Sequence, residues 1–238
     1  MARHFDLTAF TYAHRGLWSP DGPPENSLAA FKAAAEAGLG IEYDVRPSMS
    51  GEAMVFHDAK LSRMTGARGV FEEQDTAALS ALRLAGTDEP VPTLADLLDI
   101  WPGNLPLLTE LKIDGKTDPE AFARTVGDQL SRHIGPAAAM SFDEAAVDAL
   151  PDVLMRGQLI KPIHRTSAAE FDAKLARALD RKVDYLAINV ADAERAAVLL
   201  AGEKPFVVWT IRSMADLRRI RLLHGAAIFE HLPVPLAS

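Results

Sequence analysis

The sequence contains no cysteine among its 238 residues. This absence excludes a disulfide framework, thiolate metal sites and a cysteine nucleophile. It fits a reducing compartment, and a cytoplasmic protein is therefore expected. A chain of this length can bury a substantial core without covalent staples.

Long apolar segments are also missing. The longest apolar run, 196–201, is far shorter than the ~20 residues that a membrane-spanning helix needs. The first ten residues, MARHFDLTAF, include charged side chains and lack the apolar stretch of a signal peptide. Neither a membrane span nor a secretory leader is predicted.

An excess of positive charge is absent as well. The chain has 25 Lys and Arg against 33 Asp and Glu, which gives a net charge of −8. This balance argues against nucleic acid as a partner, because nucleic-acid-binding proteins present a basic surface. An acidic protein still binds an anionic small molecule where it has a local positive site or a bound cation. A small-molecule substrate is therefore expected, and self-association into a homo-oligomer is left open.

What the sequence does contain is an alternation of short apolar runs with amphipathic helical patterns, which is typical of βα units. Eight expected strands with seven helices between them predict a closed TIM (β/α)₈ barrel, a single domain over residues 1–238. An open doubly wound sheet is the alternative, but a glycine-rich phosphate turn is missing. The expected strands are 9–13, 40–45, 106–111, 137–142, 154–160, 184–189, 205–211 and 226–230.

Helix starts are marked by capping residues. Asn26 or Ser27 precedes the first helix and Gly38 follows it, while Gly225 is expected to end the last one. The other start signals are Thr93 with Asp96, Asp118 with Pro119, Ser167, and Ser213 with Asp216.

One stretch breaks the alternation. Residues 41–58 read IEYDVRPSMSGEAMVFHD, and the turn signal Ser50-Gly51 predicts a β-hairpin there. A turn centred on these two residues would place Asp44 roughly opposite His57. Residues 58–92 contain no convincing barrel strand, so they are expected to form a small insertion over the barrel mouth.

Three carboxylates are candidates for holding a metal ion. Glu42 and Asp44 are two residues apart on an expected strand, so both side chains point to one face. Glu110, at the end of another strand, offers a third oxygen ligand, and three carboxylates suit Mg²⁺ or Ca²⁺. The alternative is a structural ion-pair network with Arg46 or Lys112.

Two histidines lie at expected strand ends, where the chemistry of an α/β barrel is located. His14 ends the first strand and His57 ends the hairpin, and two histidines can act as an acid and base pair near neutral pH. For each one alone, a structural histidine is the alternative. Surface or packing positions are expected for His4, His133, His164, His224 and His231.

Arg15 and Lys112 are candidate anion binders, since guanidinium and ammonium groups both suit phosphate. Trp209, near the end of a later strand, is a candidate wall for the pocket. Solvated charges and a core aromatic residue are the alternatives. Two cationic side chains and a divalent cation around two histidines together indicate a phosphoryl site.

These elements in this order resemble the glycerophosphodiester phosphodiesterase family. The resemblance implies a TIM barrel with an insertion after its second strand. It implies a cation held by Glu42, Asp44 and Glu110, acid–base catalysis by His14 and His57, and phosphate binding by Arg15 and Lys112. It also places Glu25 in the site. The matching stretches are AHRG at 13–16, PENSLAAF at 24–31, IEYDVRPSMSGEAMVFHDAKLSRMTG at 41–66, VPTLADLL at 91–98, PLLTELK at 106–112, SFD at 141–143 and VVWTI at 207–211.

The C-terminal part departs from the family pattern. Arg212 stands where family members often have Asn, and residues 230–233 read Glu-His-Leu-Pro in place of Thr-Asp-x-Pro. Both lie near the alcohol side of the substrate, so the alcohol stays open, and Arg212 is either a contact for an extra negative charge or a surface arginine. The expected reaction is hydrolysis to sn-glycerol 3-phosphate and an alcohol. A lysophospholipase D-like lyase that forms a cyclic phosphate and a non-catalytic barrel for a phosphorylated ligand are the alternatives.

Overall fold

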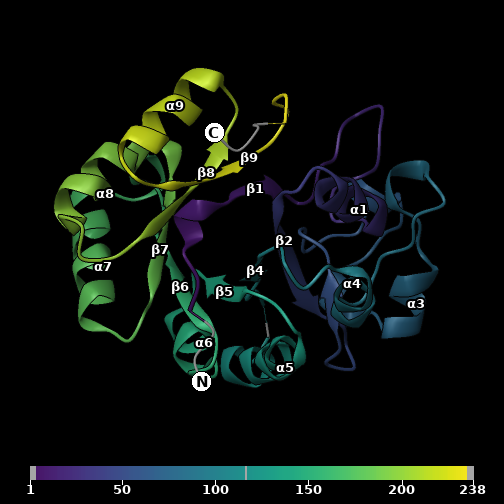
Figure 1. Cartoon of the computed structure of the whole chain (residues 1–238). Coiled ribbons are helices and arrows are strands. Elements are labelled where there is room, and N and C mark those ends of the chain that lie inside the picture. Colours follow the sequence, from purple (N-terminus) through teal and green to yellow (C-terminus); the bar gives the residue numbers. More distant parts are fainter. Residues whose placement is uncertain (1–3, 116, 235–238) are drawn as a thin grey trace.

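In a computed structural model, which describes residues 4–115 and 117–234, eight parallel strands form a closed barrel (Figure 1). The barrel closes because β1 pairs with both β2 and β9, with His14 beside Glu42 and Ala13 beside Phe229. The predicted TIM barrel is confirmed, and every expected strand lies within two residues of an observed one. The strands are β1 (Thr11–His14), β2 (Gly40–Pro47), β4 (Leu107–Leu111), β5 (Ala137–Ser141), β6 (Met155–Leu159), β7 (Tyr185–Asn189), β8 (Phe206–Ile211) and β9 (Ala226–Phe229).

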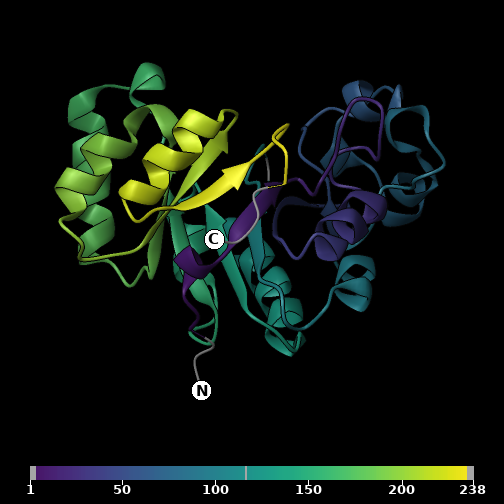
Figure 2. The ribbon, with the colours of Figure 1, turned by 45° about the horizontal axis from the view of Figure 1, so that its top comes forward.

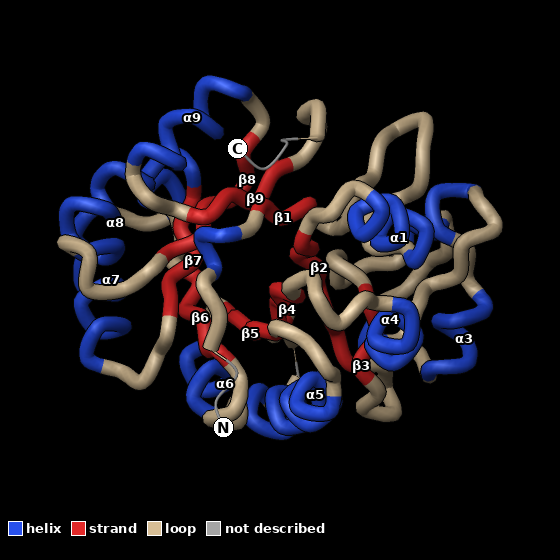
Figure 3. Tube along the Cα trace, viewed as in Figure 1, coloured by secondary structure: helices blue, strands red, loops and turns tan. Residues whose placement is uncertain are grey.

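Seven helices cover the outside of the barrel (Figure 3). Ser27 caps the first through its hydroxyl, which accepts from the Ala30 amide at 3.1 Å, and Thr93 with Asp96 forms the predicted capping box. In the part of the chain that the structure describes, no helix is both long and apolar enough to cross a membrane. The seven are α1 (Leu28–Glu36), α4 (Leu94–Ile100), α5 (Pro119–Arg132), α6 (Glu144–Ala149), α7 (Ala168–Asp180), α8 (Ala193–Leu200) and α9 (Met214–Leu222).

The end of α9 differs from the prediction. His224, not Gly225, adopts the left-handed backbone there, with φ of 58°. A glycine is needed at position 225 for packing instead, because a Cβ atom there would lie 2.8 Å from the ring of Phe206. The glycine therefore lets the helix end approach β8 closely.

The barrel interior is filled with side chains below the mouth, by which we mean the C-terminal ends of the barrel strands. Tyr12, Leu108 and Met140 are buried there, and the Tyr12 hydroxyl donates to the Leu7 carbonyl at 3.0 Å. A larger apolar layer separates the barrel from its helices. Because the interior is packed, chemistry is confined to the mouth, as in other barrels of this kind.

The predicted hairpin is present, with a register one residue away from the expected one. β3 (Ala53–Val55) is antiparallel to β2 and pairs Val45 with Val55, so Asp44 lies opposite Phe56 rather than His57. The expected pairing is wrong because the loop has three residues, not two. The Ser48 amide donates to the Glu52 carbonyl at 2.9 Å, and Gly51 between them has φ of 85°. A left-handed third residue is typical of a three-residue hairpin loop.

The insertion that follows the hairpin contains α2 (Ser62–Thr65), α3 (Thr76–Ala81) and the short 3₁₀ helices Phe71–Glu73 and Leu84–Gly86. It has a small core of its own. Figures 1 and 2 show most of it beyond α1 and α4, to one side of the barrel axis. The core residues are Met54, Phe56, Leu61, Met64, Phe71, Leu79, Leu84 and Val91.

Candidate active site

The predicted metal ligands come together at the mouth on the adjacent strands β2 and β4. Asp44 is the register partner of Glu110, and Glu42 is the partner of His14 on β1. One oxygen from each of the three carboxylates lies within 4.8 Å of the others. The period of two residues along β2 is what turns Glu42 and Asp44 to the same side.

All three carboxylates are buried, at 8% exposure or less. Burial, and then the negative charges of Asp44 and Glu110, raise the pKa of Glu42 well above its usual range. Burial also raises the pKa of Glu110. At Asp44 burial is outweighed by Lys112 and Arg15, which hold its pKa well below the usual range. A cluster of this kind suits a hard divalent cation, because such a cation would compensate the charge at Glu42 and Glu110.

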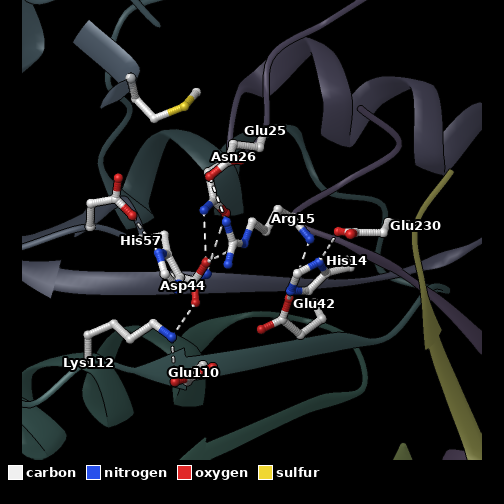
Figure 4. Close-up of polar contacts among 12 residues, drawn as sticks. His14, Arg15, Glu25, Asn26, Glu42, Asp44, His57, Glu110, Lys112 and Glu230 are labelled. Atoms are coloured by element: carbon white, nitrogen blue, oxygen red, sulfur yellow. Dashed lines mark hydrogen bonds and ion pairs between the residues drawn. The ribbon is translucent and has the colours of Figure 1, made fainter. Parts of the chain in front are cut away.

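Two cationic side chains border the carboxylates (Figure 4). Lys112 Nζ lies 2.9 Å from Asp44 Oδ1 and 2.5 Å from Glu110 Oε1. Arg15 Nη1 lies 2.8 Å from Glu25 Oε1, and its Nε lies 3.3 Å from Asp44 Oδ2. The ion-pair network considered as an alternative is therefore present with Lys112, alongside the possible metal site.

Arg46, the other residue considered for that network, does not reach the cluster. Its Nε donates to the His57 carbonyl at 2.7 Å, and its terminal nitrogens pair with Glu72 and with Asp114. Arg46 thus ties the hairpin to the insertion and to the segment after β4.

Asn26 belongs to the site, although its sequence context indicates only a helix cap. Ser27 is the cap, and Asn26 Nδ2 donates to Asp44 Oδ2 at 2.9 Å. Arg15 and Asn26 both have left-handed backbones, with φ of 57° and 56°, and the Asn26 amide donates to the Arg15 carbonyl. This contact holds Asn26 beside the residue that follows β1. Strained backbone of this kind often occurs at functional sites.

Both predicted histidines are held through Nδ1 by a carboxylate that an arginine contacts in turn. His14 Nδ1 lies 2.6 Å from Glu230 Oε2, whose other oxygen lies 2.6 Å from Arg212 Nε. Because Nδ1 is engaged, Nε2 of His14 is the nitrogen left for chemistry, and it lies 3.9 Å from Glu42.

His57 repeats this arrangement. Its Nδ1 lies 2.7 Å from Asp58 Oδ1, and Asp58 Oδ2 lies 2.5 Å from Arg63 Nε. Burial lowers the pKa of both imidazoles, so a neutral ring is favoured over its protonated form. Arg63 also contacts Glu25 at 2.6 Å, which connects the insertion to the residues around Arg15.

Glu230 and Arg212 appeared in the sequence only as departures from a family pattern. Burial opposes ionisation of Glu230, but hydrogen bonds from His14 and Arg212 lower its pKa to about 2. Arg212 is an exposed residue, as expected for a surface arginine, with 61% of its side chain accessible, and its Nε also pairs with Glu230. The contact between Glu230 and His14 follows from the strand register, because the pairing of Ala13 with Phe229 places residue 230 next to His14.

A cavity of about 510 Å³ opens over these groups and includes both histidines in its wall. Trp209 lines it and packs edge-on against Phe142, with ring centroids 6.1 Å apart. The structure thus places all nine predicted site residues at the mouth. His164, expected on the surface or in packing, also lines this cavity. His231 instead packs against Trp18 at 4.4 Å.

Comparison with known proteins agrees with this geometry. Residues 14–231 match the model of the glycerophosphoryl diester phosphodiesterase family. A probable glycerophosphodiester phosphodiesterase 2 of Mycobacterium tuberculosis is 38% identical over 91 residues, which cover 38% of this chain and 34% of that protein. The glycerophosphodiester phosphodiesterase of Caldanaerobacter subterraneus is 34% identical over 103 residues, which cover 40% and 41%. The matched stretches thus span about a third to two fifths of these relatives.

Two solved structures have the same fold. A phosphodiesterase of Oleispira antarctica in complex with the product sn-glycerol-3-phosphate has a TM-score of 0.81 at 24% identity, covering 94% of both chains. A glycerophosphodiester phosphodiesterase of Thermotoga maritima has a TM-score of 0.74 at 25% identity, covering 95% of both. The barrel and its insertion are therefore shared along nearly the whole chain.

Proposed function

Because the chain belongs to the glycerophosphoryl diester phosphodiesterase family, we propose that it hydrolyses glycerophosphodiesters to sn-glycerol 3-phosphate and an alcohol. The proposal depends on one observation: three kinds of side chain meet at the mouth of the barrel. They are the three buried carboxylates, the two histidines held by carboxylates, and two cationic side chains suited to binding phosphate. In support, a protein of the same fold binds sn-glycerol-3-phosphate.

The residues proposed to hold a divalent cation, Mg²⁺ or Ca²⁺, are Glu42, Asp44 and Glu110. When bound, such a cation supplies Lewis-acid stabilisation of a phosphoryl oxygen and lowers the pKa of a nucleophilic oxygen. Asn26 and Lys112 hold Asp44 in place through bonds of 2.9 Å each. The triad is therefore positioned before any ligand binds.

Arg15 and Lys112 are the proposed phosphate-binding residues. Both are mostly buried, with side-chain exposures of 16% and 14%, and both are fixed by carboxylates. Fixed positive groups in a cavity stabilise charge that grows on phosphoryl oxygens without having to reorganise. Trp209 lines the cavity beside this position, and Glu25 contacts Arg15 at 2.8 Å.

His14 and His57 are the proposed acid and base. One imidazole takes the proton of the attacking water as the new P–O bond forms, and the other gives a proton to the alcohol oxygen as the old P–O bond breaks. Glu230 and Asp58 hold Nδ1 of the two rings, which leaves each Nε2 to exchange protons. The cyclic phosphate alternative differs only in the nucleophile, a hydroxyl of the glycerol arm.

The test is phosphodiester hydrolysis with glycerophosphocholine, glycerophosphoethanolamine and glycerophosphoglycerol, each with Mg²⁺, Ca²⁺ or EDTA. Cation-dependent release of sn-glycerol 3-phosphate is expected, and phosphorus NMR would reveal a cyclic product if a hydroxyl is the nucleophile. His14→Ala and His57→Ala should each lower kcat by roughly 10²–10⁴-fold. His4→Ala, which changes an exposed histidine away from the mouth, serves as the control. Near wild-type turnover in both site variants would refute the acid–base assignment.

A further inference from the structure

A second cavity, of about 570 Å³, lies beside the one that contains both histidines. The two cavities share wall residues, among them His57, Glu110 and Lys112. A phosphodiester held at Lys112 therefore has space on this side for one of its two arms. Residues of the turn after β6 also line both cavities.

The cations in the wall of the second cavity fall into two groups. Arg46 and Lys112 are paired with carboxylates. The side chains of Lys161 and Arg165 have no ion pair or hydrogen bond with any residue in 4–115 or 117–234. The remaining carboxylate in the wall, Asp143, accepts the Ala146 amide at 2.9 Å as the cap of α6. Two positive groups thus face this cavity without a partner.

The backbone that carries these two groups is fixed. The segment 161–166 follows β6 and forms a short 3₁₀ turn around the buried Pro162. The Ile163 amide donates to Asp192 Oδ2 at 3.0 Å, and the Thr166 hydroxyl donates to the Pro162 carbonyl at 3.2 Å. In a chain with a net charge of −8, two exposed cations carried on this fixed backbone attract anions locally.

We propose that Lys161 and Arg165 form a subsite for a second phosphate group, carried by the alcohol arm of the substrate. The guanidinium fork of Arg165 suits phosphate oxygens, and Lys161 adds a point charge. The inference rests on the proposed phosphodiesterase function and names its substrate class: glycerophosphodiesters whose alcohol bears its own phosphate or phosphodiester. Reaction at the scissile phosphate is unchanged by this subsite.

The test compares two substrates that differ by one anionic group. Glycerophosphoglycerol has a neutral alcohol arm, and bis(glycerophospho)glycerol carries an additional phosphodiester on that arm. The wild-type protein should show at least roughly tenfold higher kcat/KM on the doubly charged substrate. Lys161→Gln/Arg165→Gln should lower kcat/KM on that substrate by roughly five- to thirtyfold, the size expected from losing two partly exposed ion pairs. Its kcat/KM on glycerophosphoglycerol should change by less than about twofold.

The matched control is Lys182→Gln/Arg218→Gln, which removes the same charge from exposed positions away from the mouth. It should leave the ratio between the two substrates unchanged. Equal rates on both substrates, or an equal loss on both in the Lys161/Arg165 variant, would overturn the subsite while leaving the phosphodiesterase proposal intact. Failure of the wild-type protein on both substrates with either cation would instead overturn the phosphodiesterase proposal.

Discussion

At the scale of single residues, the feature that distinguishes this site is the carboxylate behind each histidine. Glu230 and Asp58 both bind Nδ1, and both are held by an arginine. A buried carboxylate at Nδ1 fixes the ring and its tautomer, and it favours the protonated ring when the proton arrives. Glu230 is therefore a positioning residue that acts through His14.

Replacing Glu230 tests this role. Glu230→Gln keeps the size of the side chain but removes its negative charge, so we expect kcat to fall roughly ten- to hundredfold with little change in KM, as for outer partners of functional histidines. Because the Glu230 carboxylate raises the pKa of His14, its loss should move the limb of the pH–rate profile that reports His14 to lower pH. Steady-state kinetics between pH 5 and 9 measure both effects.

The control for this prediction is Glu203→Gln, which changes an exposed carboxylate in the turn between α8 and β8. It should leave kcat and the profile as they are. A Glu230→Gln protein whose kcat falls without any movement of the profile would show that Glu230 matters only for packing.

The nine site residues named from the sequence were predictable because each belongs to a short local motif. Of the residues that were missed, Glu230 is recognisable only through long-range pairing. Glu230 lies 216 positions from His14 and becomes its partner only when β9 is placed beside β1. Asn26 was hidden for a different reason, since its neighbour Ser27 also explains the helix start.

At the scale of secondary structure elements, the hairpin β2–β3 shows how one backbone position sets a register. Three loop residues with Gly51 in the left-handed region move every cross-strand pair by one residue relative to a two-residue turn. Turn signals in the sequence locate such a loop, but its length depends on which residues form the closing hydrogen bonds. The strands themselves were predictable, because buried parallel strands are continuous apolar runs.

Gly51 is therefore a position where a side chain should cost stability. Gly51→Ala is expected to lower the free energy of unfolding by about 1 kcal/mol, because an L-residue is disfavoured at φ of 85° although nothing lies within 4 Å of an added Cβ. Gly51→Asn should cost less, since Asn tolerates this region better. Urea unfolding followed by circular dichroism gives both values. Equal stability of all three proteins would mean that the loop relaxes to another conformation.

At the scale of the whole molecule, the negative charges at the mouth lower the stability of the folded protein. Three buried carboxylates face one another, and burial with mutual repulsion raises the pKa of Glu42 and Glu110. A cation that binds only the folded protein offsets this cost and stabilises the fold by mass action. The insertion contributes to the same region, since Arg63 contacts Glu25.

Thermal unfolding measures this coupling. Mg²⁺ or Ca²⁺ at a hundredfold excess over its Kd should raise Tm by about 5–10 °C, which corresponds to about 2.7 kcal/mol for a chain of this size. EDTA should reverse the increase. Glu42→Gln removes one proposed ligand together with its repulsion, so this variant should have a smaller increase. An unchanged Tm with both cations at millimolar concentration would contradict a cation site at the triad.

The position of β1 has a consequence for how the protein is made. β1 lies between β2 and β9, so the first strand of the barrel to leave the ribosome receives its second neighbour only when the last strand of the barrel has appeared. At about 5–20 residues per second, His14 waits roughly 10–40 s for Glu230. During this interval one edge of β1 is unpaired and invites pairing with other chains. Synthesis therefore completes the barrel and the pairing of His14 with Glu230 in the same final step, and a chain interrupted before β9 has neither.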